Sequence, residues 1–137
     1  MRITSLVKVD SKGRVTIPLF IREALDIQEG RYLIVIADVD KKEILLTPIS
    51  SKGESIYEIK VELQDKPGAL AEFSKMLKEL GFDQLMIRCS TIKRGEIGEC
   101  ISIAEPVDKG VSLEKVKEAL ESSDIVYFVS IKKLERA

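Results

Sequence analysis

Residues 7–25 have the sequence VKVDSKGRVTIPLFIREAL, and this stretch decides the fold of the N-terminal part of the chain. Apolar and polar residues alternate through Val7–Val9 and again through Val15–Ile17, which is typical of strands with one buried face. Ser11–Gly13 predicts a tight turn between them, because glycine adopts a positive φ without strain. Pro18 has no N–H and a fixed φ, so it ends the second strand and begins a short helix that fills the rest of the stretch.

Cations are concentrated in the same part of the chain. Residues 1–22 carry five positive charges and one negative charge, a local net charge of +4, whereas the whole chain has a net charge of −1. A basic patch on one element is sufficient to bind phosphates if dimerisation doubles it. The alternative interpretation is that these lysines and arginines form the solvated face of an ordinary hairpin.

A second hairpin is predicted to follow the helix. Tyr32–Ala37 and Glu43–Thr47 are rich in apolar residues and flank the polar residues 38–42, which gives the order ββαββ. The run Leu33–Ile36 has apolar side chains on both faces, and a sheet from about 50 residues cannot cover both. We therefore expect an obligate homodimer of two interlaced copies.

The motifs Gly13-Arg14, Ile17-Pro18 and Ile21-Arg22 resemble the swapped-hairpin DNA-binding domain of AbrB-like transcriptional regulators and MazE-like antitoxins. The resemblance covers residues 3–49 and implies a domain over residues 1–49 that binds double-stranded DNA. It also implies which side chains face the DNA: Lys8, Lys12, Arg14 and Arg22. Glu23 stands where several of these regulators have a second arginine, so one phosphate contact of the family pattern is in question.

Residues 50–56 are rich in serine and predict a linker. From Tyr57 the pattern changes to strand, helix, strand, strand, helix, strand, so the fold class of the whole chain is α+β. The expected strands cover residues 57–63, 84–92, 97–104 and 125–131, and the expected helices cover residues 68–80 and a segment capped by Ser112. Asp65 is a candidate N-cap for the first of these helices.

The order βαββαβ, with Asp65, Pro67, Gly68, Ala69 and Leu70 after its first strand, resembles the ACT domain, a ferredoxin-like module that binds amino acids or other small metabolites. The resemblance covers residues 57–134 and implies a regulatory domain over residues 57–137. It implies that these five residues hold the ligand's polar groups beside a neighbouring subunit. A helix N-terminus favours a carboxylate, and an aspartate can accept from an ammonium group. The alternative interpretation is that Asp65 only caps the helix.

The later strands carry apolar residues on both faces, while one layer of helices covers a single face. Met86, Ile92, Val126 and Phe128 are expected to point away from the helices. This pattern favours contacts between the C-terminal domains of different subunits, and so a possible tetramer, whereas scattered exposed apolar side chains are the alternative.

Enzymatic activity is not expected, because the chain has no histidine and no glycine-rich phosphate loop. Its two cysteines, Cys89 and Cys100, are too few for a zinc site, and we expect no metal and no cofactor. A turn at Arg94-Gly95 would place the cysteines opposite each other, so a disulfide is geometrically possible. Without a hydrophobic leader or a run of transmembrane length the chain is expected to be cytoplasmic, where buried, reduced thiols are the commoner state.

These patterns predict a DNA-binding transcriptional regulator whose ACT domain senses a small-molecule effector, an amino acid in particular. An antitoxin-like or adaptor protein that holds a protein partner, with the ACT domain serving only for oligomerisation, is the alternative. The chain lacks asparagine and tryptophan and is rich in Glu and Lys, a composition that fits a thermophile.

Overall fold

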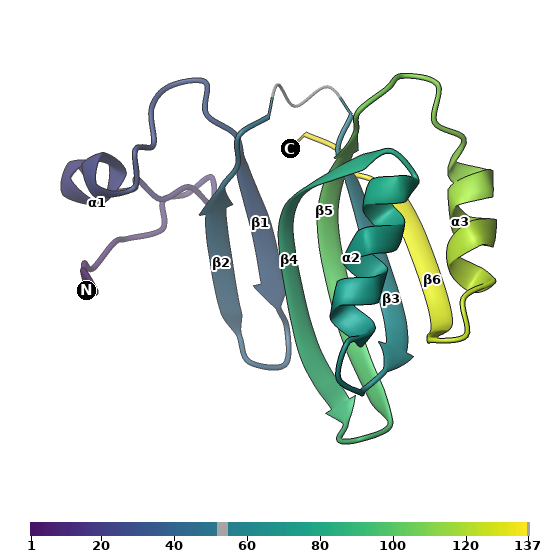
Figure 1. Ribbon diagram of the computed structural model, residues 1–137. Coiled ribbons are helices and arrows are strands. Elements are labelled where there is room, and N and C mark those ends of the chain that lie inside the picture. The colour runs from purple at the N-terminus through teal and green to yellow at the C-terminus, as the bar shows by residue number, and fades with distance from the viewer. Residues whose placement is uncertain (52–54, 137) are drawn as a thin grey trace. The chain divides into compact units, whose positions relative to one another are not determined.

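The computed structural model describes residues 1–51 and 55–136 of the chain (Figure 1). The chain divides into two compact units: an N-terminal unit, Met1–Ser50, and a C-terminal unit, Ser51–Ala137. The predicted linker at residues 50–56 includes residues 52–54, which lie outside the described residues.

The N-terminal unit contains one short helix and one hairpin. Helix α1 spans Leu19–Ala24 and begins directly after Pro18, whose φ of −54° is compatible with a helix start. Strands β1 (Leu33–Asp38) and β2 (Glu43–Pro48) pair in antiparallel register, and Lys42 in the turn between them has a φ of 55°. The helix and this hairpin lie where the sequence predicts them.

The first predicted hairpin is not formed in the single chain, so the order ββαββ is wrong for one copy. Residues 1–17 contain a turn at Ser11–Gly13 but no strand. One hairpin-like hydrogen bond remains, from the backbone N–H of Asp10 to the carbonyl oxygen of Arg14, at 2.9 Å. Val9 and Val15 are 61% and 46% exposed, and an isolated two-stranded hairpin with no covered face is marginal at best.

The N-terminal unit has almost no core of its own. Among residues 1–50, only Ile34 and Ile49 are buried, and α1 buries no residue. Large apolar side chains are exposed along the whole unit, including Ile3, Leu6, Val7, Val9, Val15, Leu19, Phe20, Leu25, Val35, Val39, Ile44 and Leu46. Because monomeric proteins rarely expose so continuous an apolar surface, this unit requires a partner surface to be stable.

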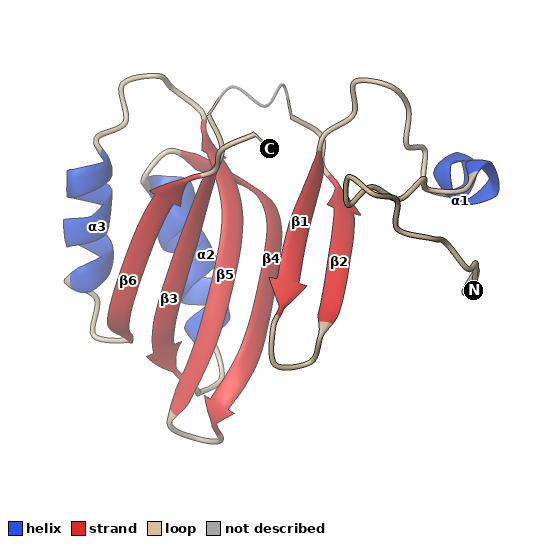
Figure 2. Cartoon of the chain, turned by 180° about the vertical axis from the view of Figure 1, so that it is seen from behind, coloured by secondary structure: helices blue, strands red, loops and turns tan. Residues whose placement is uncertain are grey.

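The C-terminal unit follows the predicted order of elements. They are β3 (Tyr57–Gln64), α2 (Ala69–Glu79), β4 (Phe82–Lys93), β5 (Ile97–Pro106), α3 (Leu113–Glu121) and β6 (Val126–Lys133). The strands form one antiparallel sheet in the order β4-β5-β3-β6. Figures 1 and 2 show α2 and α3 on the same face of this sheet.

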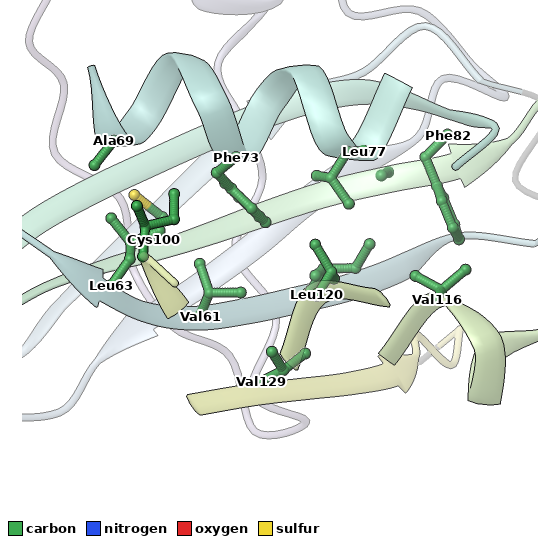
Figure 3. Close-up of a cluster of buried hydrophobic side chains, with 13 residues drawn as sticks. Val61, Leu63, Ala69, Phe73, Leu77, Phe82, Cys100, Val116, Leu120 and Val129 are labelled. Carbon is green, nitrogen blue, oxygen red and sulfur yellow. The ribbon is translucent and has the colours of Figure 1, made fainter. Parts of the chain in front are cut away.

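Both helices are amphipathic and bury one stripe against the sheet. Helix α2 buries Ala69, Phe73 and Leu77, and α3 buries Val116 and Leu120. These side chains meet buried residues of the strands in a single cluster, which includes Ile59, Val61, Leu63, Cys100 and Val129 (Figure 3). Ser112 caps α3 as predicted, since its Oγ accepts from the backbone N–H of Lys115 at 3.4 Å. The C-terminal unit therefore has its own core.

A bulge changes the predicted direction of one side chain in β6. Phe128 lies opposite Glu62, but Val126 lies opposite Leu63, so Tyr127 is an additional residue in the pairing. The bulge turns Val126 toward the core, against the expectation that it points away, and leaves Tyr127 57% exposed. Simple alternation along the strand cannot reveal such a bulge.

The face of the sheet opposite the helices is mixed in character. Lys60 and Glu99 lie 3.7 Å apart, and Lys132 and Glu58 lie 3.8 Å apart, so ion pairs cross the neighbouring strands. Phe128 is half exposed on the same face. Association of C-terminal units through this face stays a prediction.

We expect Leu77→Ala to lower the free energy of unfolding of the C-terminal unit by about 2–5 kcal/mol, because it leaves a cavity where a fully buried side chain packs between α2 and the sheet. Lys78→Ala, on the exposed side of the same helix, should change it by no more than about 0.5 kcal/mol. Urea unfolding followed by circular dichroism measures both. Similar losses in the two variants would contradict the assigned core.

Candidate nucleic-acid interface and ligand site

Asp10 organises the basic turn of the N-terminal unit. Its Oδ1 accepts hydrogen bonds from the backbone N–H groups of Lys12, at 2.9 Å, and Arg14, at 2.8 Å. Its Oδ2 accepts from Nε of Arg14 at 2.8 Å, so the carboxylate binds both ends of the same arginine residue. Gly13 has a φ of 77°, which a side chain would disfavour. Sequence reasoning counted Asp10 only as an opposing charge and missed this role.

The hydrogen bonds at Asp10 hold the pKa of its carboxyl below the usual value of 3.8. The backbone N–H of Arg14 is the largest cause, followed by the guanidinium of Arg14, while the backbone N–H of Lys12 contributes less. The carboxylate is thus the favoured form in the folded turn. It fixes the turn that presents Lys12 and Arg14.

The four cations predicted to face DNA differ in their surroundings. Lys8, Lys12 and Arg14 are exposed, and Arg14 is paired with Asp10. Arg22 is half-buried, and its Nε donates to the carbonyl oxygen of Ile17 at 2.9 Å. A guanidinium has five N–H donors, so this bond fixes the side chain and leaves its terminal nitrogens for an anion. Arg22 therefore combines an anchoring role with a possible phosphate contact.

Acidic residues lie beside Arg22. A hollow of about 390 Å³ is lined by Leu19, Arg22, Glu23, Asp26, Ile27 and Gln28. Glu23 and Asp26 bring negative charge to this side of α1. The basic surface is consequently centred on the turn at Ser11–Gly13 rather than on the helix.

Arg31 joins distant parts of the N-terminal unit and was not singled out from the sequence. Its Nε donates to the carbonyl oxygen of Ile49 at 3.1 Å, and its Nη1 donates to that of Asp26 at 3.1 Å. Asp26 has a φ of 53°, and its carboxylate lies 3.7 Å from Nη1 of Arg31. Arg31 thus connects the turn after α1 to the residue that follows β2. No local sequence signal marks partners 18 residues apart.

Asp65 does not cap α2, which corrects the prediction. The N-cap residue is Gly68, and no side chain caps this helix. The Oδ2 of Asp65 instead accepts from the backbone N–H of Gly95 at 2.7 Å, and the backbone N–H of Asp65 donates to the carbonyl oxygen of Glu96 at 3.2 Å. Asp65 therefore ties the loop before α2 to the turn between β4 and β5.

The loop residues predicted to hold a ligand lie only partly in one hollow. Asp65, Ala69 and Leu70 line a hollow of about 300 Å³, but Pro67 and Gly68 do not. The φ of Gly68 is 89°, and a Cβ there would meet no atom within 4 Å. Glycine at this position therefore serves the backbone conformation, and a substitution would strain the chain without filling a cavity in the single copy.

The two cysteines lie in the wall of the same hollow. Cys89 of β4 is directly opposite Cys100 of β5, as the turn position predicts, and the two form a disulfide. The sequence left the redox state of the pair open, with reduced thiols as the commoner outcome, and the structure has the disulfide. Cys100 also packs in the core.

Within residues 1–51 and 55–136, no three or more His, Cys, Asp and Glu side chains gather in a way that could hold a metal ion. In the same described part of the chain, no helix is both long enough and apolar enough to cross a membrane.

A small unit that exposes cations on one turn and lacks a core is typical of nucleic-acid-binding domains that fold as dimers. Residues 6–54 match the family described as "Antidote-toxin recognition MazE, bacterial antitoxin". This part of the chain is therefore a MazE-type domain, which agrees with the resemblance of its Gly-Arg and Ile-Pro motifs.

No curated protein matches the chain. Among solved structures, the chain is similar to the solution structure of the C-terminal domain of the MgtC protein from Mycobacterium tuberculosis, with 18% sequence identity and a TM-score of 0.48. The match covers 65% of this chain and 97% of the other.

We expect the stability of the basic turn to be present above pH 3.8, the usual pKa of an aspartate, and to be lost as the pH falls through the lower pKa of Asp10 in the folded chain. Arg14→Ala should raise the pKa of Asp10 only part of the way to 3.8, because the backbone N–H groups of residues 12 and 14 still donate to it. Carboxyl chemical shifts followed by NMR across the acid range measure both. A wild-type Asp10 pKa at or above 3.8 would rule out this account of the turn.

Proposed function

We propose that the protein is a DNA-binding transcriptional regulator in which the N-terminal unit binds DNA as an interlaced homodimer and the C-terminal unit is an ACT-type domain that senses an amino acid. The match to a MazE-type domain supports a regulator or antitoxin-type role. We propose no catalytic activity for the chain.

The turn built on Asp10 is the observation that carries the DNA-binding proposal. Asp10 makes five hydrogen bonds with residues 12–14, which hold a short turn in one conformation: three to its carboxylate, one from its N–H and one to its carbonyl oxygen. Lys12 and Arg14 are exposed there, and Lys8 lies just before it. Because phosphate binding gains from cations that are already ordered, such a turn loses less conformational entropy on DNA than a flexible basic segment would.

Arg14 and Arg22 should contribute unequally to affinity. The side chain of Arg22 is fixed by its hydrogen bond to the carbonyl oxygen of Ile17. Arg14 is paired with Asp10 and has to give up part of this pairing to contact a phosphate. In a dimer each substitution removes two cations. We expect Arg14→Ala and Arg22→Ala each to weaken DNA binding and to reduce the slope of log K against log salt by about 2, similarly for different sequences. Fluorescence anisotropy with labelled genomic fragments at several salt concentrations measures both quantities.

Lys41→Ala is the matched control, because it removes one exposed cation of the same unit from the turn between β1 and β2. It should leave the affinity and the salt slope nearly unchanged. Equal effects of all three variants would point to general charge attraction. If both arginine variants bind DNA with the wild-type affinity and salt slope, Arg14 and Arg22 do not contact DNA.

The ligand proposal depends on the hollow beside α2. Asp65 supplies a carboxylate that could face an ammonium group, and Ala69 and Leu70 bring the first turn of α2, whose positive end favours a carboxylate. At about 300 Å³ the hollow has the size of a small-metabolite site. A second subunit would supply the remaining wall, as the resemblance to ACT domains implies.

Asp65→Asn tests this site more cleanly than a substitution of Gly68. The amide oxygen can still accept from the N–H of Gly95, so the turn is kept while the charge is removed. If an amino acid's ammonium group contacts Asp65, its affinity should fall by roughly tenfold or more, the effect of losing one charge-assisted hydrogen bond. Isothermal titration calorimetry with each of the common amino acids on the full-length chain measures this.

Asp108→Asn serves as the control, because Asp108 is exposed in the loop between β5 and α3 and should not affect binding. If no amino acid binds the wild-type chain, the C-terminal unit is left with an oligomerisation role.

An antitoxin-like protein remains the second candidate, and one observation favours it. The matched family is described by toxin recognition, and the hairpin β1–β2 exposes Val35 and Ile44, at 63% and 73%, on a surface that a protein partner could cover. This candidate predicts that Val35→Asp weakens binding to a protein partner while DNA binding persists. The regulator predicts that the same change lowers dimerisation and DNA affinity together.

A further inference from the structure

The disulfide in the C-terminal unit joins two sulfur atoms with very different surroundings. Cys89 and Cys100 face each other across β4 and β5, with Cα atoms 4.1 Å apart. Cys100 is 2% exposed and belongs to the core between the sheet and the helices, whereas Cys89 is exposed. Among the described strands, β4 lies at the edge of the sheet, so Cys89 has a neighbouring strand on one side only.

The disulfide shares its hollow with a lysine and with the N-terminus of a helix. Both cysteines line the hollow of about 300 Å³ that also takes in Lys66 and the first turn of α2. The N-terminus of a helix and a nearby ammonium group both stabilise a thiolate and so make a sulfur a better leaving group.

Two carboxylates belong to residues of the same hollow, and both have partners. That of Asp65 accepts from the N–H of Gly95, and that of Glu99 lies 3.7 Å from Nζ of Lys60. The negative charge of each carboxylate is therefore partly compensated by its partner. The hollow also gives a small molecule a path to the disulfide, which most disulfides inside a core lack.

We propose that the Cys89–Cys100 disulfide is a thiol-exchange site that takes low-molecular-weight thiols and dithiols. A thiolate attacks Sγ of Cys89, the more exposed of the two cysteines, a new S–S bond forms between them, and the bond to Cys100 breaks and leaves the Cys100 thiolate. A second thiolate then attacks the sulfur of the bound thiol, which leaves as an oxidised disulfide. Cys89 and Cys100 each take up one proton and together gain two electrons, which the two thiols supply.

The exchange site stands whether or not the hollow binds an amino acid. It rests on the disulfide, on the unequal exposure of its two cysteine residues and on the hollow that both of them line. Reduction would break the disulfide that links β4 to β5 across the ladder and would alter one wall of the hollow.

Full-length protein, first oxidised with excess oxidised glutathione, provides the test. N-ethylmaleimide added in denaturant should modify no cysteine before the folded protein is treated with dithiothreitol and both cysteines after that treatment, while the far-UV circular dichroism of the reduced folded protein stays unchanged. Intact-mass spectrometry counts the additions. Failure of the disulfide to form, or reduction only in denaturant, would overturn the proposal and indicate free or purely structural cysteines.

The order of attack is tested with Cys100→Ala and Cys89→Ala. On treatment with oxidised glutathione, Cys89 in the first variant should form a mixed disulfide about tenfold or more faster than Cys100 in the second, because thiol reactivity follows access. Peptide mapping of the wild-type chain in a glutathione buffer gives a second measurement that needs no variant. Glutathione found chiefly on Cys100, or equal rates in the variants, would refute attack at Cys89.

Discussion

The inability of the N-terminal unit to cover its own apolar side chains is the constraint on which the remaining structure depends. Fifty residues bury only Ile34 and Ile49, and α1 buries none of its residues. The same deficit accounts for the missing strands at residues 7–9 and 15–17, because strands with one apolar face form only when that face is covered. In the proposed homodimer a second copy would supply such a cover and would double the basic surface at the same time. Folding, association and charge concentration would then be a single event in this unit.

Asp10 shows how an acidic residue can serve a basic surface. It reduces the net charge of the segment, yet it orders both the backbone and the guanidinium that it opposes. An exposed ion pair such as Asp10–Arg14 contributes little to the free energy of folding. Its main effect is to fix the conformation of the turn. A phosphate that approaches Arg14 meets a side chain whose direction is already restricted.

The sequence predicts the C-terminal unit well because its signals are local. Helical spacing in α2 and α3 and alternation in β3 each lie within a dozen residues, and the core follows from them. The errors arise where partners are distant or absent. Asp65 lies next to a helix start, but its hydrogen bond goes to Gly95, 30 residues away, which no local pattern specifies. Val126 was misplaced because a bulge depends on the register with β3.

The predictions of site residues also succeed where the signal is local and fail where the contact depends on the fold. The basic residues could be identified from charge and motif, but the anchoring of Arg22 by Ile17 and the connection made by Arg31 depend on folded geometry. The disulfide is instructive in another way. Its pairing followed from the turn position alone, whereas its formation is a chemical event that spacing does not determine.

The two units differ in autonomy, and this difference gives the chain a route to regulation. The C-terminal unit has a core of its own, formed between its helices and its sheet. In the proposed regulator the N-terminal unit completes its core with a second copy, so the population of DNA-binding dimers depends on any free energy that favours two chains together. A preference of about 1–3 kcal/mol between assembled forms of the C-terminal unit would change that population roughly 5- to 150-fold. So small a free energy of coupling is sufficient because it acts on the association equilibrium of the N-terminal unit, which the N-terminal sequence alone does not drive to one side.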